Sequence, residues 1–299
     1  MDAAALARGG LIRRTPLVRW GDARVKLENL QNTGSFKVRG AALRLGALRD
    51  DERARGVVAA SAGNHGLGVA AAGRALGIRV EIIVPRTAPE VKRRGIAALG
   101  ATVVEAGAGY DEAERAARAR AAVTGAVFVS AYDDPWVQWG NGGTLAEEIL
   151  EQAPDVKRVA CPVGGGGMIS GMAQVLAPRG VQLIGVQPAA NCAMSESLRL
   201  GRALTEYEGR PTLAEGCEGA VATSTFEICR RHGVTIVLVD EDAIRSAIAF
   251  AYRELGQIVE PSAAVAIAGV RERCVPTDRL VVVASGGNIQ PSLLDEILR

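Results

Sequence analysis

The chain has 299 residues, of which 48% are hydrophobic and 23% charged, and its formal net charge at pH 7 is +2. Positive and negative residues are interspersed along the sequence, so we expect no basic surface that binds nucleic acid. No apolar run approaches the roughly 20 residues that span a bilayer, so we expect no membrane association. The stretch Met1–Arg14 lacks the apolar core of a signal peptide, which predicts a cytoplasmic protein.

The cysteines and histidines exclude two further classes of protein. The five cysteines are scattered, odd in number and form no Cys-x-x-Cys pair, so neither a disulfide framework nor a zinc site is expected. With only two histidines, His65 and His232, the chain cannot build a His-rich metal site.

Short apolar strands alternate with longer amphipathic helices along the chain. After an alternating apolar run at 25–30, the pattern predicts strands at 56–60, 79–84, 101–105, 126–130, 156–162, 181–187, 235–239 and 280–284. It predicts helices at 41–48, 65–76, 89–99, 111–122, 144–152, 168–176, 241–255, 261–271 and 291–298. The stretch 188–218 reads as irregular. Repeated strand–helix alternation predicts parallel sheets covered by helices, the α/β class.

Two turn-rich stretches bracket a compact segment of four strands. They lie at 49–55 and 131–143. We therefore expect two lobes, each a mostly parallel twisted sheet flanked by helices. The small domain, 56–134, would be inserted in a large domain formed by 1–55 and 135–299.

Three predicted strands end in unusual turns, at 61–66, 164–168 and 285–288. In open α/β sheets, ligands sit at the carboxyl ends of strands. Four glycines, Gly164 to Gly167, can turn several N–H groups toward one point at a helix start, which favours a phosphate guest. A flexible surface loop is the alternative, but it has no need to lie between an apolar strand and an apolar helix. The glycines fit neither Gly-x-Gly-x-x-Gly, since Ser170 stands where glycine is needed, nor a P-loop.

Lys37 lies at the centre of the segment 32–40. It opens a helix, follows Phe36, and is surrounded by small or hydroxylated residues that let a ligand approach. A phosphate site together with a recessed lysine indicates pyridoxal 5'-phosphate, held by its phosphate and joined to the lysine as a Schiff base.

Five motifs now resemble those of one family in the same order along the chain. They are Ser35-Phe36-Lys37-Val38-Arg39-Gly40, Ser61-Ala62-Gly63-Asn64-His65, Gly164 to Met168, Glu260-Pro261-Ser262 and Ser285-Gly286-Gly287-Asn288. The chain resembles the serine/threonine dehydratases, fold-type II pyridoxal-phosphate enzymes that are related to the serine racemases. The resemblance covers essentially the whole chain.

The resemblance assigns roles to individual residues around the cofactor. It implies that Lys37 forms the Schiff base and then removes the α-proton of the substrate. It also implies that Phe36 packs against the cofactor ring; the alternative is that Phe36 is an ordinary residue of the apolar core. Asn64 would bind the phenolic oxygen of the ring; the alternative is that Asn64 only caps a helix. Ser285 faces the pyridine nitrogen; a neutral hydroxyl there makes the ring a weaker electron sink and favours elimination.

The resemblance also implies that two further stretches bind anionic groups. Ser61, with the N–H groups of Ala62, Gly63, Asn64 and His65, would bind the substrate carboxylate. The phosphate would be held by Gly164, Gly165, Gly166, Gly167 and Met168.

The implied reaction is dehydration and deamination of a β-hydroxy amino acid, such as L-threonine or L-serine, to a 2-oxo acid and ammonia. The alternatives are a serine racemase, another hydroxy-amino-acid lyase of this fold, or a non-catalytic pyridoxal-phosphate-binding protein. Racemases need a second acid–base serine where this chain has Ala62. A carrier has no need of Ser61.

Other positions depart from the family pattern. The carboxylates of the family's divalent-cation site align with Gln187 and Ala193, so we expect no essential metal. Leu67 stands where glutamine is usual, and Asn141-Gly142-Gly143-Thr144 replaces Gly-Gln-Gly-Thr. The chain stops at Arg299, soon after the last motif, so isoleucine feedback through a C-terminal domain is not expected. Related enzymes are commonly dimers or tetramers, which predicts a homo-oligomer.

Overall fold

The computed structural model describes residues 9–299. Its chain divides into two compact units. Within the described residues, the smaller unit comprises 9–13 and 37–141, and the larger unit comprises 14–36 and 142–299. None of the helices between residues 9 and 299 is both long enough and apolar enough to cross a membrane.

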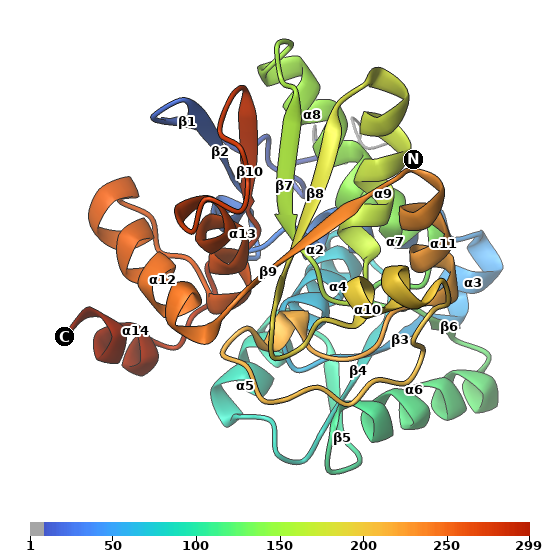
Figure 1. The fold of residues 1–299 in the computed structure, drawn as a ribbon. Helices are drawn as coiled ribbons and strands as arrows, with labels where there is room; N and C mark the ends of the chain where they lie inside the picture. Colours follow the sequence, from blue (N-terminus) through green and yellow to red (C-terminus); the bar gives the residue numbers. More distant parts are fainter. Residues whose placement is uncertain (1–8) are drawn as a thin grey trace. The chain divides into compact units, whose positions relative to one another are not determined.

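The smaller unit is built on a four-stranded sheet in which every pair of neighbours is parallel (Figure 1). Its strands, in spatial order, are β5 (Thr102–Glu105), β4 (Val80–Val84), β3 (Val57–Ala60) and β6 (Val127–Phe128). The helices are α2 (Lys37–Gly46), α3 (Asp50–Arg55), α4 (Asn64–Leu76), α5 (Glu90–Ala98), α6 (Tyr110–Thr124) and α7 (Pro135–Gln138). The π-helical turn η2 (Trp139–Gly143) leads out of this unit. All four residues of β3 are buried, as expected for a central parallel strand covered on both faces.

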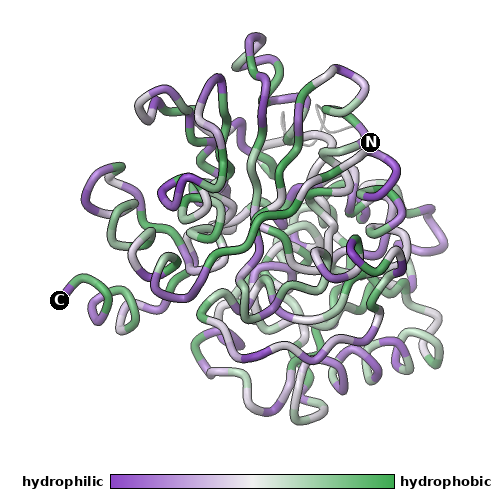
Figure 2. Tube along the Cα trace, in the orientation of Figure 1, coloured by the Kyte–Doolittle hydropathy of each residue, from purple (hydrophilic) through white to green (hydrophobic). Residues whose placement is uncertain are grey.

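Helix α6 shows how the pattern of the sequence produces this packing. Ala113, Ala117 and Ala121 recur every four residues and are buried in one cluster with Val58 and Ala60 of β3. Asp, Glu and Arg side chains occupy many of the other positions of the helix, and Figure 2 shows the resulting alternation of purple and green along its turns. Its small apolar stripe therefore lies directly on the sheet.

The larger unit contains a six-stranded sheet in which only β1 and β2 are antiparallel. The strands, in spatial order, are β1 (Leu17–Trp20), β2 (Ala23–Leu27), β10 (Leu280–Ala284), β7 (Arg158–Pro162), β8 (Gln182–Pro188) and β9 (Thr235–Val239). The α-helices are α8 (Thr144–Gln152), α9 (Gly167–Leu176), α10 (Ala193–Leu200), α11 (Thr223–Arg231), α12 (Glu241–Leu255), α13 (Pro261–Arg271) and α14 (Pro291–Leu298). The short 3-10 turns are η1 (Glu28–Leu30), η3 (Ala177–Arg179) and η4 (Glu215–Cys217).

Helices cover both faces of this sheet. One apolar core joins α12 and α13 to one face, and a second joins α8, α9, α10 and α11 to the other (Figure 1). Two parallel-dominated sheets flanked by helices confirm the predicted α/β class.

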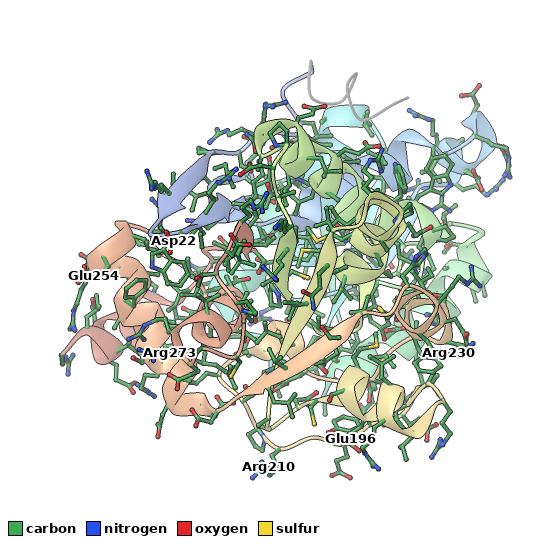
Figure 3. The ribbon with its side chains drawn as sticks, turned by 45° about the horizontal axis from the view of Figure 1, so that its top comes forward. Asp22, Glu196, Arg210, Arg230, Glu254 and Arg273 are labelled. Carbon is green, nitrogen blue, oxygen red and sulfur yellow. The ribbon has the colours of Figure 1, made fainter. Side chains whose placement is uncertain are left out.

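The charged surface of the larger unit carries exposed ion pairs. Glu196 and Arg230, both labelled in Figure 3, pair with Arg199 and Glu227 at 2.6 and 2.7 Å. Exposed pairs of this kind are each worth only about 0–1 kcal/mol. The apolar cores, rather than the surface pairs, therefore account for the stability of this unit.

One lysine is buried within the larger unit. Lys26 of β2 is fully buried and donates to Thr15 O at 2.7 Å, to Gln152 Oε1 at 2.6 Å and to the Glu148 carboxylate. Thr15 Oγ1 in turn donates to buried Glu28 at 2.5 Å. The ammonium of Lys26 is thus neutralised and hydrogen-bonded, which is the condition under which a buried charge is tolerated.

All five cysteines are free thiols. Cys161, Cys217 and Cys229 are buried, Cys192 is half-buried and Cys274 is exposed. Burial raises the pKa of the Cys161 thiol and raises the pKa of Cys229 to about 12. The thiols of Cys161 and Cys229 are therefore protonated and unreactive at neutral pH.

Most predicted elements coincide with observed ones, and six of them have the predicted bounds. These six are α8, α12, α13, α14, β9 and β10. The sequence reading missed β1, α3, α7, α10 and α11. Two of the missed helices, α10 and α11, flank the glycine turn that follows β7.

The observed division of the chain differs from the predicted domain boundaries. Residues 37–55 pack with the smaller unit, whereas the sequence reading placed 1–55 in the large domain. The cause is close contact between α2 and α4: a Cβ at Gly68 of α4 would lie 3.1 Å from the carbonyl group of Lys37. The second boundary falls at 141/142 rather than at 134/135.

Candidate active site

Lys37 is the first residue of α2, in the smaller unit. Its Nζ donates a hydrogen bond to the carbonyl oxygen of Ala131 at 3.0 Å. Ala131 lies beyond the end of β6, so the amine is held at the carboxyl edge of this sheet. That edge is where parallel α/β sheets bind their ligands.

The start of the helix that carries Lys37 is fixed by a buried side chain. Asn141 is fully buried, and its Oδ1 accepts a hydrogen bond from Gly40 N at 3.0 Å. Gly40 lies in the first turn of α2, where backbone N–H groups have no partner within the helix. Asn141 therefore caps the helix that carries Lys37, which gives one of the departures from the family pattern a structural role.

The neighbouring Gly142 explains another part of that departure. It is the first residue of the larger unit's second segment, and a Cβ there would overlap Met168 O and Met172 N of α9. The glutamine that is usual at this aligned position cannot be built on this backbone.

His65 lies beside Lys37 in the same unit. Its Nε2 is 3.0 Å from Val129 O, and it therefore donates to this carbonyl, while its buried Nδ1 has no hydrogen-bond partner among residues 9–299. Burial, followed by the positive charge of Lys37, lowers the pKa of His65 to about 3. The segment 129–131 thus holds a neutral imidazole through one carbonyl and the Lys37 amine through another.

The buried His65 predicts acid sensitivity of folding. The unfolded chain takes up a proton near the ordinary pKa of 6.5, whereas the folded protein does so only near 3. The contribution of His65 to stability is therefore complete above pH 6.5 and falls by about 1.4 kcal/mol per pH unit as the pH drops toward 3. Urea denaturation at pH 7, 6 and 5 measures this slope.

The matched variant for that experiment is His65→Gln, which keeps an N–H donor for Val129 O but does not titrate. We expect its free energy of unfolding to vary less with pH than that of the parent protein. Equal slopes for the two proteins would contradict the assignment.

The predicted substrate-carboxylate turn lies between β3 and α4, also in the smaller unit. Ser61 is 9% exposed, and its Oγ accepts a hydrogen bond from Gly63 N at 3.1 Å. This bond uses one of the N–H groups predicted to bind substrate. The backbone N–H groups of Ala62 and His65 donate to no acceptor within residues 9–299, so they remain open to an anion. Asn64 is the first residue of α4.

The predicted phosphate loop joins β7 to α9 in the larger unit. Gly166 has φ +91°, and a Cβ there would lie 2.8 Å from both Met194 Cε and Thr225 Oγ1. None of the backbone N–H groups from Gly164 to Met168 donates to an acceptor in the part of the chain that the structure describes. Open N–H groups at the start of a helix, in a cradle without side chains, fit a phosphate.

The last predicted cofactor contacts lie on a third turn of the larger unit. Phe36 N donates to Ser285 O at 3.0 Å, and Ser35 pairs with Gly286 as an isolated antiparallel bridge. Phe36 packs on the edge of the apolar core that contains α9. Ser285 is 2% exposed and lies directly after β10. Phe36 and Ser285 are thus brought together.

The side chain at the aligned metal position is already satisfied by the protein. Gln187 is fully buried; its Nε2 donates to Val163 O at 3.3 Å and its Oε1 accepts from Ser195 N at 2.9 Å. Among residues 9–299 there is no cluster of three His, Cys, Asp or Glu side chains placed to hold a metal ion. The donor set around Gln187 does not suit a hard divalent cation.

The structure therefore assembles the predicted residues in two sets. Lys37 and the turn 61–65 lie in the smaller unit, and Phe36, the loop 164–168 and Ser285 lie in the larger one. The sequence did not predict the supporting role of three buried side chains, Asn141, Gln187 and Thr225. Asn141 and Gln187 stood out as departures from the family pattern, whereas Thr225 gave no signal in the sequence.

One family model and several known proteins are similar to this chain. The model of the family described as pyridoxal-phosphate dependent enzyme matches residues 9–286. The L-threonine ammonia-lyase of Thermotoga maritima is 43% identical over 282 residues, which cover 93% of this chain and 70% of that protein.

Two solved structures are similar over nearly the whole chain. The processed form of threonine deaminase isoform 2 from Solanum lycopersicum has a TM-score of 0.90 and 33% identity, covering 99% of this chain and 93% of that one. Maize serine racemase has a TM-score of 0.90 and 28% identity, with coverage of 98% and 94%.

Proposed function

Because the chain belongs to the family of pyridoxal-phosphate-dependent enzymes, we propose that it eliminates water from a β-hydroxy amino acid. The substrates would be L-threonine or L-serine, and the products a 2-oxo acid and ammonia. The observation that carries this proposal is the position of Lys37, at a helix start and packed against α4, whose first residues form the carboxylate turn. A lyase needs this combination of an amine and an anion site.

Pyridoxal phosphate, when bound, supplies an electron sink for the negative charge left at the α-carbon of the substrate. We propose that Lys37 bonds the cofactor in the resting enzyme and takes the α-proton of the substrate. Ser61 and the open N–H groups of Ala62 and His65 bind the substrate carboxylate. The loop from Gly164 to Met168 binds the phosphate. The open backbone N–H groups at 62, 65 and 164–168 support the two anion-binding roles.

Three other side chains contribute through position and polarity. Phe36 packs against the cofactor ring and Asn64 binds its phenolic oxygen. Ser285 offers the pyridine nitrogen a neutral hydroxyl rather than a carboxylate, so negative charge is drawn less strongly into the ring. Early departure of the β-hydroxyl is then favoured over the proton return that racemisation requires. The released enamine hydrolyses to the 2-oxo acid and ammonia.

Racemisation is the second candidate, because maize serine racemase shares the fold. It requires a proton donor on the opposite face of the cofactor, at the position of Ala62. A methyl group has no proton to give. Ala62 therefore favours elimination over racemisation. A passive carrier of the cofactor would have no need of Ser61, so the presence of Ser61 together with Lys37 favours an enzyme.

The decisive experiment measures the two products of the same incubation. The purified holoenzyme is given L-threonine, L-serine and bulkier β-hydroxy amino acids, and 2-oxo acid and D-enantiomer are quantified by chromatography. We expect 2-oxo acid to exceed enantiomer for every substrate that reacts. No 2-oxo acid from any of them would refute the proposal, and an excess of enantiomer would favour the racemase.

We also propose that the protein acts in the cytoplasm as a homo-oligomer, without nucleic acid, membrane or an essential divalent metal. Five free thiols suit a reducing compartment. The hydrogen bonds of Gln187 occupy the place where a metal would need carboxylates. Light scattering tests the assembly, and activity that survives a chelator tests independence from metal.

A further inference from the structure

The backbone of the glycine loop has its carbonyl groups anchored and its N–H groups open. Val163 O accepts from Gln187 Nε2 at 3.3 Å, Gly165 O from Thr225 Oγ1 at 2.8 Å, and Gly166 O from Ser170 N at 3.0 Å. Since a peptide group points its N–H and C=O in opposite directions, anchoring the carbonyls fixes where the N–H groups point.

Thr225 is the anchor at the centre of the loop. It lies in the first turn of α11 and is fully buried. Its Oγ1 is also 3.0 Å from Ala222 O, but that carbonyl already accepts from Phe226 N at 3.0 Å. The single hydroxyl proton is therefore needed by Gly165 O, for which the described chain offers no other donor.

Thr225 also touches the loop sterically. A Cβ at Gly166 would lie 2.8 Å from the Cβ of Thr225, so the side chain forms the wall behind the glycine with φ +91°. Met194 of α10 closes the same wall. The loop is consequently held in place from behind, on the side where no ligand needs to approach.

We propose that Thr225 is a positioning residue for the cofactor phosphate: its hydroxyl holds Gly165 O so that the N–H groups of the loop face the phosphate. This role rests on the proposed function and adds a residue to it. Gln187 acts in the same way on Val163 O, at the other end of the loop. Because the loop is already ordered before the phosphate binds, little conformational entropy is lost on binding.

Removing the hydroxyl of Thr225 takes away the donor to Gly165 O, which belongs to a half-buried residue. Losing a hydrogen bond of this kind weakens the arrangement that it holds by roughly tenfold. The carbonyl can then turn toward the place of the phosphate, where an oxygen repels the anion. The loss of the hydroxyl should therefore mainly lower the affinity for ligands that carry a phosphate group.

The test compares three ligands on two variants of the apoprotein. Dissociation constants of pyridoxal 5'-phosphate, pyridoxal and inorganic phosphate are measured by calorimetry for the parent protein, Thr225→Val and Thr225→Ser. Valine has the same shape without the hydroxyl, and serine keeps the hydroxyl. We expect Thr225→Val to weaken the two phosphate ligands roughly tenfold or more and pyridoxal less than about twofold. Thr225→Ser should bind all three as the parent does.

Equal weakening of pyridoxal and pyridoxal phosphate in Thr225→Val would overturn the proposal, because it would indicate a general packing defect. Unchanged phosphate binding would overturn it as well. If Thr225→Val does not fold, Gln187→Met decides: selective loss of phosphate binding supports the anchored loop, and no loss refutes it. Failure of the parent protein to bind pyridoxal phosphate would instead refute the proposed function.

Discussion

Replacing Lys37 with alanine is expected to lower the rate of 2-oxo acid formation by roughly 10³-fold or more. The variant loses both the group that bonds the cofactor and the base that takes the α-proton. It should also lose the visible absorbance of lysine-bound cofactor, which a spectrum of the purified protein measures. The variant should still fold, since His65 holds the carbonyl of Val129 in the same segment without the Lys37 side chain.

Because the chain has few lysines, the assignment of Lys37 as the lysine that bonds the cofactor can be tested against each of the others. The chain contains four of them, Lys26, Lys37, Lys92 and Lys157. Lys26 is buried among oxygen acceptors in the larger unit. Lys157 is half-exposed on the surface near Asp278, so Lys157→Ala is the matched control and should keep its activity. An intact visible band in Lys37→Ala, with a lost band in any other lysine variant, would show that the lysine is misassigned.

Gly166→Ala is expected to abolish stable binding of the cofactor and to destabilise the larger unit. Two costs add: alanine at φ +91° is strained, and its Cβ would lie 2.8 Å from Met194 Cε and from Thr225. Backbone strain of this kind costs about 1–3 kcal/mol, and forcing extra atoms into a packed site typically costs about 1–3 kcal/mol. Retention of cofactor on a desalting column measures the loss of binding, and urea denaturation measures the loss of stability.

The control for this variant is Gly201→Ala in the same unit. Gly201 has φ +69°, but no atom lies within 4 Å of the position of its Cβ. It therefore reports strain without collision, and the protein should retain its cofactor. If the two variants behave alike, the tight cradle around Gly166 is not what holds the loop.

The predicted elements that match the structure are those with strong local signals at their ends. Helix α12 starts after Asp240, whose side chain accepts from Ala243 N at 2.8 Å, and ends at Gly256 in the left-handed conformation. Helix α13 starts at Pro261. Such caps act within a few residues, so the sequence alone reveals them.

The missed helices depend on contacts between residues far apart in the chain. Helix α11 begins with Thr223, Ser224 and Thr225, which favour turns in isolation. Its start is stabilised by Gly165 O, sixty residues earlier in the sequence, which Thr225 reaches from its first turn. The same reasoning explains why the motifs revealed Lys37 and the glycine loop but not the side chains that support them.

Local patterns in the sequence also do not predict the domain boundary. Whether α2 belongs with one sheet or the other depends on its fit to the small residues of α4, above all at Gly68. A sequence of small residues predicts a helix that can pack closely, but not the identity of its partner. The boundary therefore emerges only from tertiary contact.

The distribution of thiols gives the protein a preferred attachment point. All five cysteines lie within the described residues, and Cys274, just after α13, is the one that is exposed, while Cys192 is half-buried. A maleimide dye should therefore couple to Cys274 of the native chain faster than to Cys192, without any engineered mutation. Cys161, Cys217 and Cys229 become accessible only when the larger unit unfolds. Mass spectrometry counts the dyes attached per molecule, and this number therefore reports how far unfolding has proceeded at each time.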